Sequence, residues 1–475
     1  MDLHLKSAAA TPLQEQVVAA LRAAIAAKQL LPGEKLPSIR RLAAANRISP
    51  FTAVEAYDRL AAQGLITAKP KSGFFVAGRE APLTLAARED MPGRATAEAV
   101  DPVWMMRQSL SLDDRVVHSA CGWLPDSWLP EDGIRRALRG IAAMPGAPVL
   151  QYGHPLGYLP LRQQICLRLA ELDIAARPET ILLTDGASQA IDLVCRHLLQ
   201  PGDAVLVDDP GYFNYHAVLR AHRVRALPVP VTRNGIDLGE LERLAAAEHP
   251  KLYLTNPALQ NPTGLSLAPG QAHRLLNLAQ RFDFRIIEDD VFRDFQSVPT
   301  PRLAALDGAP SESGRVLHLG GFSKTISAAL RVGFIAGPEE TIRHLTDLKL
   351  ATTFGNNQVA AQVVHRLLED GSYRKHIAGV REKLRKATPP LRRKLEALGL
   401  RLFAETEQGM FLWMELPRQA PDATVLAARA IEQGVVLAPG SVFSPLRQWT
   451  RFLRINIAQS ASPRLTEFMK DGLRR

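Results

Sequence analysis

Residues 316–331, VLHLGGFSKTISAALR, join an apolar run to small and polar residues and end in an arginine. The apolar run has the length of a strand that is buried on both faces. Comparable runs occur at 181–184, 204–207, 224–229, 252–255, 285–288 and 332–336, with amphipathic helical patterns between most of them. Short apolar runs that alternate with helical patterns predict an α/β domain with a mainly parallel central sheet.

Residues that could bind a ligand or take part in catalysis follow these runs directly. They occupy 185–190, 208–212, 256–264, 289–290 and 320–325, and Arg331 comes seven residues after Lys324. Ligands of parallel sheets gather at the carboxyl ends of strands and at helix N-termini. Backbone N–H groups at 185–190 and the Ser188 hydroxyl therefore suit a phosphate. Each segment alone has an ordinary explanation, because a single lysine is usually a surface charge and Asn-Pro-Thr-Gly is usually a turn.

Taken in chain order, the segments resemble fold-type I pyridoxal-phosphate enzymes of the aminotransferase class across roughly residues 116–475. The resemblance implies that Lys324 forms the Schiff base with pyridoxal 5′-phosphate and that Asp289 pairs with the ring nitrogen. Asn261 would hydrogen-bond the ring 3′-oxygen, and Tyr212 would stack on the ring. The residues implied at the phosphate are Gly186, Ala187, Ser188, Ser323 and Arg331.

The resemblance implies two further site residues. Tyr152, in QYGHPLGYLPLR, resembles the tyrosine that reaches the phosphate of the neighbouring subunit, which makes a homodimer the expected state. Arg454, in RFLRINIA, resembles the arginine whose planar fork holds a substrate α-carboxylate. The stretches 409–416 and 437–443 fit the smaller C-terminal lobe of the same fold.

The chain departs from this family pattern in two places. Relatives usually carry a tyrosine two or three residues after the ring-nitrogen aspartate, where this chain has Val291 and Phe292. Relatives also often have a hydroxyl three residues before the lysine, where this chain has Gly321. We expect the cofactor still to bind, with fewer donors available to support transamination.

The first 80 residues contain three short helical patterns and a hairpin. The stretch 11–28 repeats Leu13, Val17, Leu21 and Ile25 on one face, with a capping box from Thr11 to Gln14. A second helix is expected after Ser38 and a third after Ser49, with Val54, Tyr57, Leu60 and Ala61 on the inner face of the third. Residues 65–78 read as two strands around a basic turn at 69–73. Together they predict a winged helix-turn-helix whose third helix enters the major groove.

This segment resembles the GntR family. The match is carried by Leu36, Pro37, Ser38, Arg40, Leu42, Ala43, Ser49, Thr52, Ala56, Tyr57, Leu60 and Gly64. The expected DNA-binding residues are Ser38, Arg40, Arg41, Arg47, Ser49, Thr52, Lys69 and Lys71. Many relatives have arginine where this chain has Pro50, which shifts charged contacts to the other arginines. The alternative is that these arginines only solvate an amphipathic helix.

Composition and charge narrow the class of protein. The chain has 475 residues, of which 46% are hydrophobic and 22% charged, a balance that argues against global disorder. The net charge is +10, and residues 1–80 carry 11 Lys and Arg against 6 Asp and Glu, as expected of a segment that meets nucleic acid. Without an apolar stretch of about 18 residues or a leader-like N-terminus, we expect a cytoplasmic protein with no membrane span. Cys121, Cys166 and Cys195 favour free thiols over a disulfide framework or a metal site.

The predicted organisation is a DNA-binding domain at 1–78, a linker at 79–115 and an aminotransferase-like domain at 116–475. Within the linker, residues 103–106 form an apolar island that either docks onto a domain or binds a partner. This architecture resembles the MocR group of GntR regulators. It implies a pyridoxal-phosphate-dependent transcriptional regulator that binds double-stranded promoter DNA and responds to a small amino compound, an amino acid or pyridoxal phosphate itself. The alternatives are an active aminotransferase with an accessory DNA-binding domain, and a DNA-binding scaffold without cofactor.

Overall fold

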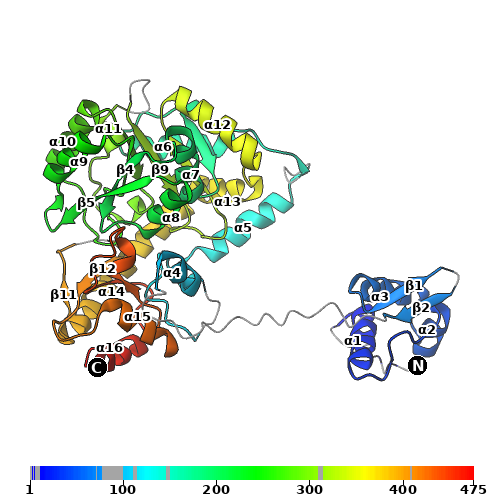
Figure 1. Cartoon of the computed structure of the whole chain (residues 1–475). Coiled ribbons are helices and arrows are strands. Elements are labelled where there is room, and N and C mark those ends of the chain that lie inside the picture. Colours follow the sequence, from blue (N-terminus) through cyan, green and yellow to red (C-terminus); the bar gives the residue numbers. More distant parts are fainter. Residues whose placement is uncertain are drawn as a thin grey trace. The chain divides into compact units, whose positions relative to one another are not determined.

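The computed structural model describes residues 3, 5, 11–70, 72–77, 100–110, 115–145, 150–308, 314–406 and 409–474. The chain divides into two compact units, Met1–Gly93 and Arg94–Arg475 (Figure 1). Much of the predicted linker therefore lies outside the described residues. Each unit is described by itself.

The N-terminal unit is a three-helix domain with one hairpin. Its elements are α1 (Leu13–Ala26), α2 (Ile39–Asn46), α3 (Pro50–Ala62), β1 (Ile66–Lys69) and β2 (Gly73–Val76). The two strands are antiparallel, and Lys69 pairs with Gly73 next to the turn. Val17, Leu21, Leu42, Tyr57 and Leu60 are buried together between the helices. The predicted winged helix-turn-helix is confirmed.

The starts of the three helices confirm two expected caps and correct one. Ser38 Oγ accepts a hydrogen bond from the Arg41 N–H at 3.3 Å, and Ser49 Oγ accepts one from the Thr52 N–H at 3.0 Å. The capping box from Thr11 to Gln14 is wrong. Helix α1 begins at Leu13 with Pro12 as its N-cap and no side-chain cap. Because the helix starts one residue later than expected, Thr11 lies before the first turn.

The inner face of α3 also differs from the expectation by one position. Ala53, Ala56, Tyr57 and Leu60 are buried, and the half-buried Ala61 packs against this core, whereas Val54 is half-buried and does not belong to it. The buried residues follow the three- and four-residue spacing of one helical face. Small alanines thus face α1 and α2, and the bulkier Val54 was wrongly placed in the core.

An eight-stranded sheet forms the centre of the C-terminal unit. The strands are β3 (Ile181–Thr184), β4 (Ala204–Asp209), β5 (Arg225–Thr232), β6 (Gly235–Ile236), β7 (Leu252–Thr255), β8 (Arg285–Asp289), β9 (Val316–Gly321) and β10 (Gly333–Ala336). Their order is β3-β10-β9-β8-β7-β4-β5-β6. Strands β9, β8, β7, β4 and β5 are parallel, while β10 and β6 are antiparallel to their neighbours. The predicted mainly parallel sheet is confirmed.

Helices cover both faces of this sheet. Alternate strand residues belong to different apolar clusters, as Ile286 and Ile287 of β8 do, because successive side chains point to opposite faces. One face packs against α7 (Ala187–Leu198), α8 (Phe213–Ala221) and α12 (Glu339–Thr353). The other face packs against α5 (Glu131–Ala142), α6 (Leu159–Ala170), α9 (Leu238–Glu248), α10 (Pro269–Arg281), α11 (Leu303–Leu306), α13 (Gln358–Glu369) and the start of α14 (Ser372–Ala397).

A smaller lobe follows the large sheet. It has four antiparallel strands in the order β11-β12-β14-β13, namely β11 (Arg401–Leu402), β12 (Phe411–Glu415), β13 (Ala438–Pro439) and β14 (Phe452–Asn456). Helices α15 (Ala423–Glu432) and α16 (Pro463–Gly472) pack on this sheet together with the end of α14. The lobe contributes Arg454, in the middle of β14, to the site described below.

Helix α4 (Pro102–Ser109) lies in the predicted linker but packs onto the C-terminal unit. Asp101 caps it by accepting a hydrogen bond from the Trp104 N–H at 2.7 Å. Met105 is fully buried in a cluster with Phe213 and Phe443. The apolar island at 103–106 therefore docks onto this unit.

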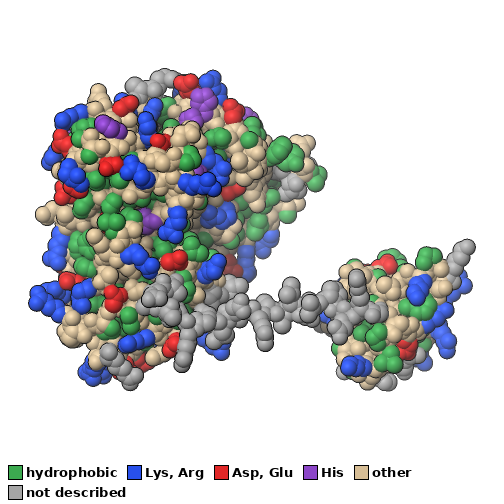
Figure 2. Space-filling view, viewed as in Figure 1, with side chains coloured by type: hydrophobic (Ala, Val, Ile, Leu, Met, Phe, Trp, Pro, Cys, Tyr) green, Lys and Arg blue, Asp and Glu red, His purple; other side chains and the backbone are tan. Residues whose placement is uncertain are grey.

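Basic side chains cluster on the surface of the N-terminal unit (Figure 2), and the three cysteines of the chain are unpaired. Lys and Arg side chains gather on the right-hand edge of the N-terminal unit in the view of Figure 2. Cys121, Cys166 and Cys195 are free thiols. Within the described ranges, no helix is both long enough and apolar enough to cross a bilayer, and no group of acidic, histidine or cysteine side chains is arranged to hold a metal ion.

Candidate functional site

The carboxyl ends of the parallel strands open into a cavity of about 580 Å³ in the C-terminal unit. Nine residues selected from the sequence line it: Ala187, Ser188, Tyr212, Asn261, Asp289, Ser323, Lys324, Arg331 and Arg454. They come from the end of β8, from the segments and helix starts that follow β3, β4, β7 and β9, and from β14 of the small lobe. Residues up to 267 positions apart in the chain thus share one cavity.

Lys324 follows β9 and directs its amine into this cavity. Burial and the positive charge of Arg454 lower the pKa of the amine to about 8, while Asp289 acts in the opposite direction. A sizeable fraction of the amine is therefore neutral near pH 8. A neutral amine is the form that attacks a carbonyl carbon.

Asp289 ends β8 and is almost fully buried. Its Oδ2 accepts a hydrogen bond from the Tyr215 hydroxyl at 2.8 Å, and its Oδ1 accepts one from the Val291 N–H at 3.3 Å. Burial raises the pKa of the carboxyl to about 6, and the hydrogen bonds limit the rise. At neutral pH this carboxylate is a buried acceptor, suited to a protonated ring nitrogen.

Sequence reasoning missed Tyr215. It lies in the first turn of α8, three residues after Tyr212, and so shares a helix face with it. The two rings meet edge to face, with centroids 5.2 Å apart. This three-residue spacing of aromatic residues is the signal that points to Tyr215.

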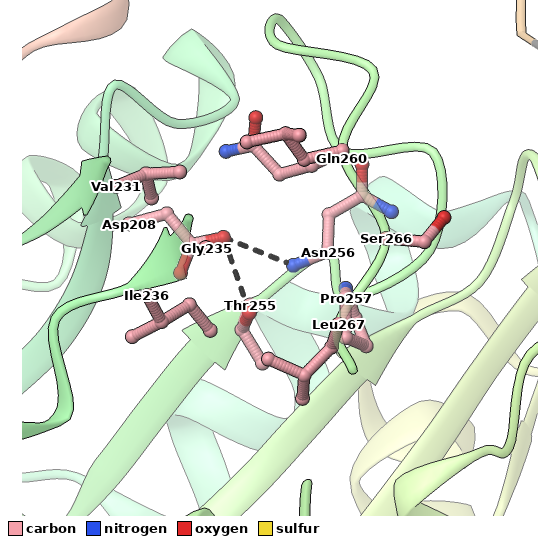
Figure 3. A pocket seen from close by; sticks show the side chains of 11 residues that line it. Asp208, Val231, Gly235, Ile236, Thr255, Asn256, Pro257, Gln260, Ser266 and Leu267 are labelled. Carbon is pink, nitrogen blue, oxygen red and sulfur yellow. Dashed lines mark hydrogen bonds between the residues drawn. The ribbon is translucent and has the colours of Figure 1, made fainter. Parts of the chain in front are cut away.

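Asn256 connects two of the expected site residues. Its Nδ2 donates to the Asp289 carbonyl oxygen at 2.6 Å, and its Oδ1 accepts from the Asn261 N–H at 2.8 Å. Behind it, Asp208 accepts hydrogen bonds from Thr255 Oγ1 at 3.1 Å and from the Asn256 N–H at 3.2 Å (Figure 3). This buried network fixes the loop after β7 against the end of β8, and with it the spacing between Asn261 and Asp289.

The turn after β3 has the shape of an anion site. Helix α7 begins at Ala187, and Gly186 before it has φ +84°, a conformation that favours glycine. A Cβ at Gly186 would lie 2.5 Å from Arg331 Nη2. Arg331 Nη2 donates to the Asp185 carbonyl oxygen at 3.0 Å, which places the guanidinium beside the free N–H groups of α7.

A buried lysine supports this turn and was also missed. Lys349 of α12 donates from Nζ to the Leu183 carbonyl oxygen at 3.0 Å and to Asn356 Oδ1 at 2.5 Å. Asn356 in turn donates to Asp185 Oδ1 at 3.0 Å. Burial lowers the pKa of Lys349 to about 8. No motif marks Lys349, because its partners belong to other elements.

Arg454 is buried, 1% exposed, and only partly paired. Its Nη1 donates to Asn261 Oδ1 at 2.7 Å and its Nη2 to the Ala120 carbonyl oxygen. Phe411 and Phe443 lie against the guanidinium, at 4.4 and 4.9 Å from its carbon to the ring centroids. Burial lowers the pKa of Arg454 to about 10, and Nε has no hydrogen-bond partner among the described residues. A carboxylate would complete this pairing.

Tyr152 lies outside the cavity of its own chain. Its side chain is 86% exposed, and its ring centroid lies 5.4 Å from that of Phe354, which is 65% exposed. Tyr212, by contrast, lines the cavity, and burial raises the pKa of its hydroxyl to about 12. Of the residues expected at the phosphate, Tyr152 is the one that the fold of a single chain does not bring there.

In the N-terminal unit, the expected DNA-binding residues that the structure describes come from α2, the turn that follows it, the first turn of α3 and the hairpin. Arg40, Arg41 and Arg47 are exposed, and Arg47 is the left-handed C-cap of α2, with φ +52°. Lys69 lies over the Phe75 ring at 4.7 Å, and Lys71 falls outside the described residues. Ser49 and Thr52 share a hydrogen bond of 2.8 Å at the first turn of α3.

Phe51 was not selected from the sequence, yet it is 76% exposed in this same turn. An exposed aromatic ring at the start of a helix that enters the major groove can contact a thymine methyl group. Its signal in the sequence is its position next to the Ser49 cap, on the face opposite Ala53 and Ala56.

The donor set of the cavity fits pyridoxal 5′-phosphate. It offers an amine to an aldehyde, a buried carboxylate to a ring nitrogen, an amide to a phenolic oxygen, and an arginine with helix N–H groups to a phosphate. The positive φ of Gly186 favours glycine in the turn that precedes α7, and the Arg331 guanidinium lies close to this backbone, as expected where backbone and an arginine face a phosphate together. The incompletely paired Arg454 lies at the other end of the site, where an amino compound would place a carboxylate.

Comparisons with known proteins cover both units. Residues 127–471 match the family described as aminotransferase class I and II, and residues 13–76 match the bacterial regulatory proteins of the gntR family. The HTH-type transcriptional regulator YdcR of Escherichia coli (strain K12) is 32% identical over 466 residues, covering 94% of each chain. The HTH-type transcriptional regulator NorG of Staphylococcus aureus (strain USA300) is 30% identical over 355 residues, covering 74% of this chain and 79% of that protein.

Solved aminotransferases share the fold of the C-terminal unit. The α-aminoadipate aminotransferase LysN of Thermus thermophilus, complexed with N-(5′-phosphopyridoxyl)-L-leucine, is 29% identical with a TM-score of 0.67, covering 82% of this chain and 95% of that chain. The kynurenine aminotransferase of Pyrococcus horikoshii is 27% identical with a TM-score of 0.67, covering 82% of this chain and 94% of that chain. The similarity thus extends from the fold to sequence in this unit.

Proposed function

The chain belongs to the aminotransferase class I and II family and carries a gntR-family domain at its N-terminus, and on this premise we propose that it is a DNA-binding transcriptional regulator of the MocR type. An amino compound at the aminotransferase-like domain would change its affinity for promoter DNA. We place this activity in the cytoplasm, where promoter DNA is accessible.

The cofactor of the aminotransferase-like domain is pyridoxal 5′-phosphate. When bound, it supplies an aldehyde that condenses with amines and a ring that withdraws electrons. Lys324 would hold it covalently, Asp289 would keep the ring nitrogen protonated, and Asn261 would donate to the 3′-oxygen. The residues that support the phosphate role are Gly186, Ala187, Ser188, Ser323 and Arg331.

Arg454 would orient the effector. Its guanidinium lines the cavity, and Nη1 and Nη2 each carry one N–H beyond the hydrogen bond that they already donate, so a carboxylate could accept a charge-assisted hydrogen bond there. Asn261 already holds Nη1, which fixes the direction of the fork. An amino compound that carries a carboxylate would thus place its amine toward Lys324, and the two ends of the ligand would be read by different elements.

The N-terminal unit would read the promoter. The exposed Arg40, Arg41 and Arg47 supply charge for phosphates, and the first turn of α3 presents Thr52 and Phe51 for base edges. Ser38 and Ser49 have their hydroxyls engaged as caps, so their part is to fix the helix ends that face the backbone. Lys69 and Lys71 would reach the adjacent phosphates from the hairpin.

We also propose a homodimer. Tyr152 and Phe354 form an exposed aromatic pair. Exposed apolar groups that lie together favour burial against another surface. In a dimer Tyr152 would complete the phosphate site of its partner, and promoter DNA with two half-sites would match the two-fold symmetry.

The observation that carries the proposal is the single cavity that holds Lys324, Asp289, Asn261 and Arg454 in a chain with a gntR-family domain. The test measures promoter affinity of the purified full-length protein, with and without pyridoxal phosphate and a panel of amino compounds. We expect at least one compound to change both the visible absorbance and the dissociation constant for DNA. If the compounds that change the visible absorbance all leave the dissociation constant for DNA unchanged, the proposal that this protein is a regulator is contradicted.

An active aminotransferase with an accessory DNA-binding domain is the second candidate. The presence of the lysine, the acid and the carboxylate-binding arginine in one cavity favours it. A turnover assay with mixed amino donors and keto acids separates the two. Repeated turnover at about 1 per second or faster would favour the enzyme. A protein that never takes up the cofactor would instead be a DNA-binding scaffold.

A further inference from the structure

One wall of the cavity consists of residues that have no role yet in binding either the cofactor or the ligand carboxylate. It contains Met106 and Ser109 of α4, its C-cap residue Leu110, and Trp123. Leu110 is 67% exposed, so much of its side chain is available to an apolar group in the cavity. These residues place apolar side chains at the mouth of the site.

Contacts locate this wall at the Arg454 end of the cavity. Cys121 Sγ donates to the Ser109 carbonyl oxygen at 3.5 Å, which joins the end of α4 to the segment around residue 121. The neighbouring Ala120 carbonyl oxygen accepts from Arg454 Nη2. Phe213, which also lines the cavity, lies 5.9 Å from the Arg454 guanidinium carbon. The α4 wall therefore faces the part of the site that holds the ligand, away from the phosphate end.

Few charged side chains line the cavity within a single chain. Among the described residues they are Asp289, Lys324, Arg331 and Arg454. Three of these face the cofactor, and Arg454 faces the ligand carboxylate. A second carboxylate or an ammonium group on the ligand would lie against the apolar side chains of Met106, Leu110 and Trp123, which is unfavourable for a charge.

We propose that the effector is an α-amino acid with an uncharged, apolar side chain that packs on Met106, Leu110 and Trp123. This inference rests on the proposed function and names the class of compound that the same site accepts. An apolar ligand side chain there would also remove the exposed Leu110 from water.

The position of α4 gives this contact a regulatory consequence. Helix α4 is the first described element of the C-terminal unit, so it is the part of that unit closest in sequence to the DNA-binding unit. An apolar ligand side chain would bind the start of the connection between the two units. A ligand that binds more tightly to one arrangement of α4 than to another would shift the population of the two, and it would do so in the segment that leads to the DNA-binding unit.

The test titrates full-length protein loaded with pyridoxal phosphate with L-leucine, L-phenylalanine, L-aspartate and L-lysine. The visible absorbance and the affinity for promoter DNA are both recorded. We expect leucine and phenylalanine to bind at least tenfold more tightly than aspartate and lysine. Leu110→Arg should weaken the binding of leucine at least tenfold and strengthen the binding of aspartate, because the new guanidinium can pair with the side-chain carboxylate of aspartate. Val298→Arg is the control, because Val298 is 71% exposed and does not line the cavity.

The outcomes separate this inference from the function on which it rests. Tighter binding of aspartate or lysine to the unmodified protein would overturn the apolar class and leave the amino-compound regulator intact. Leucine binding that leaves DNA affinity unchanged would support the class and contradict regulation. If none of the four compounds changes the absorbance of protein loaded with pyridoxal phosphate, both the apolar class of effector and the proposed regulation by amino compounds are contradicted.

Discussion

The Tyr215 hydroxyl donates a hydrogen bond of 2.8 Å to Asp289 Oδ2, and both residues are buried beneath the cavity. The bond comes from α8 and ends on β8, so it ties the helix that follows Tyr212 to the strand that carries the ring-nitrogen carboxylate. It also stabilises the charged form of that carboxyl against the effect of burial on its pKa.

Tyr215→Phe removes this donor without changing the shape of the ring. The pKa of Asp289 should rise above its present value of about 6, because one hydrogen bond to the carboxylate is lost. Pyridoxal phosphate should bind about 5- to 10-fold more weakly near pH 7, which corresponds to about 1 kcal/mol for a lost hydrogen bond. The dissociation constant measured against pH checks this.

Tyr373→Phe is the matched control for that variant. Tyr373 is equally buried, and its hydroxyl donates to Asp294 Oδ2 at 2.6 Å, outside the cavity. Its pH profile for cofactor binding should follow the unmodified protein. An equal shift in both variants would mean that the effect is a general loss of stability.

Asp289→Asn should stabilise the cofactor-free protein but reduce the stability that the protein gains from pyridoxal phosphate. Burial raises the pKa of Asp289 from 3.8 to about 6, so the carboxyl makes the cofactor-free protein less stable as pH rises through that window, by up to about 3 kcal/mol. The neutral amide avoids this loss. At pH 7 the cofactor-free variant should melt at a higher temperature than the unmodified protein.

The same variant should gain less stability from pyridoxal phosphate, since the ring nitrogen loses its anionic partner. Thermal unfolding with and without cofactor measures both effects in one experiment. A variant that melts lower than the unmodified protein without cofactor at pH 7 would contradict the destabilising role of this carboxylate.

The lowered pKa of the Lys324 amine predicts that cofactor uptake depends on pH. Because the pKa of its amine is lowered to about 8, the rate of covalent attachment should increase with pH and reach half its maximum near pH 8. Stopped-flow absorbance after mixing with pyridoxal phosphate measures the rate. A half-maximum near pH 10, typical of a solvated lysine, would contradict the effect of burial.

Lys324→Ala should abolish the visible absorbance and the covalent pyridoxyl adduct found by mass spectrometry after borohydride reduction. DNA binding without effector should remain, because Lys324 and the arginines of the N-terminal unit belong to different compact units. Loss of DNA binding together with cooperative unfolding would show that Lys324 is needed for folding instead.

Arg40→Ala and Arg47→Ala should each weaken binding to promoter DNA and reduce its salt dependence by about one unit of slope. Both side chains are exposed, Arg40 on α2 and Arg47 as the C-cap of α2, two residues before the Ser49 cap of α3. Arg22→Ala is the control, because Arg22 lies on α1 and donates to Gln63 Oε1 at 2.8 Å. Slopes that stay equal to that of the control would mean that Arg40 and Arg47 contact no phosphate.

The sequence by itself determined the order of elements and the identity of many candidate site residues. Apolar runs such as 252–255 and 316–319 became β7 and β9, because a buried strand needs continuous apolar side chains. Ser38 and Ser49 began helices as expected, because a cap is a contact within four residues. Lys324, Asp289 and Asn261 were recognisable because each lies at or shortly after the end of a strand.

Only the tertiary structure decided which side chains meet across elements. Tyr215 bonds Asp289 across 74 positions and Lys349 bonds Leu183 across 166, so no local pattern marks either pair. The cavity wall formed by Met106, Ser109, Leu110 and Trp123 depends on contacts between distant segments: Cys121 bonds the Ser109 carbonyl oxygen, and Arg454 bonds the Ala120 carbonyl oxygen. Propensity and spacing act over a few residues, whereas these contacts exist because the sheet brings distant segments to one edge.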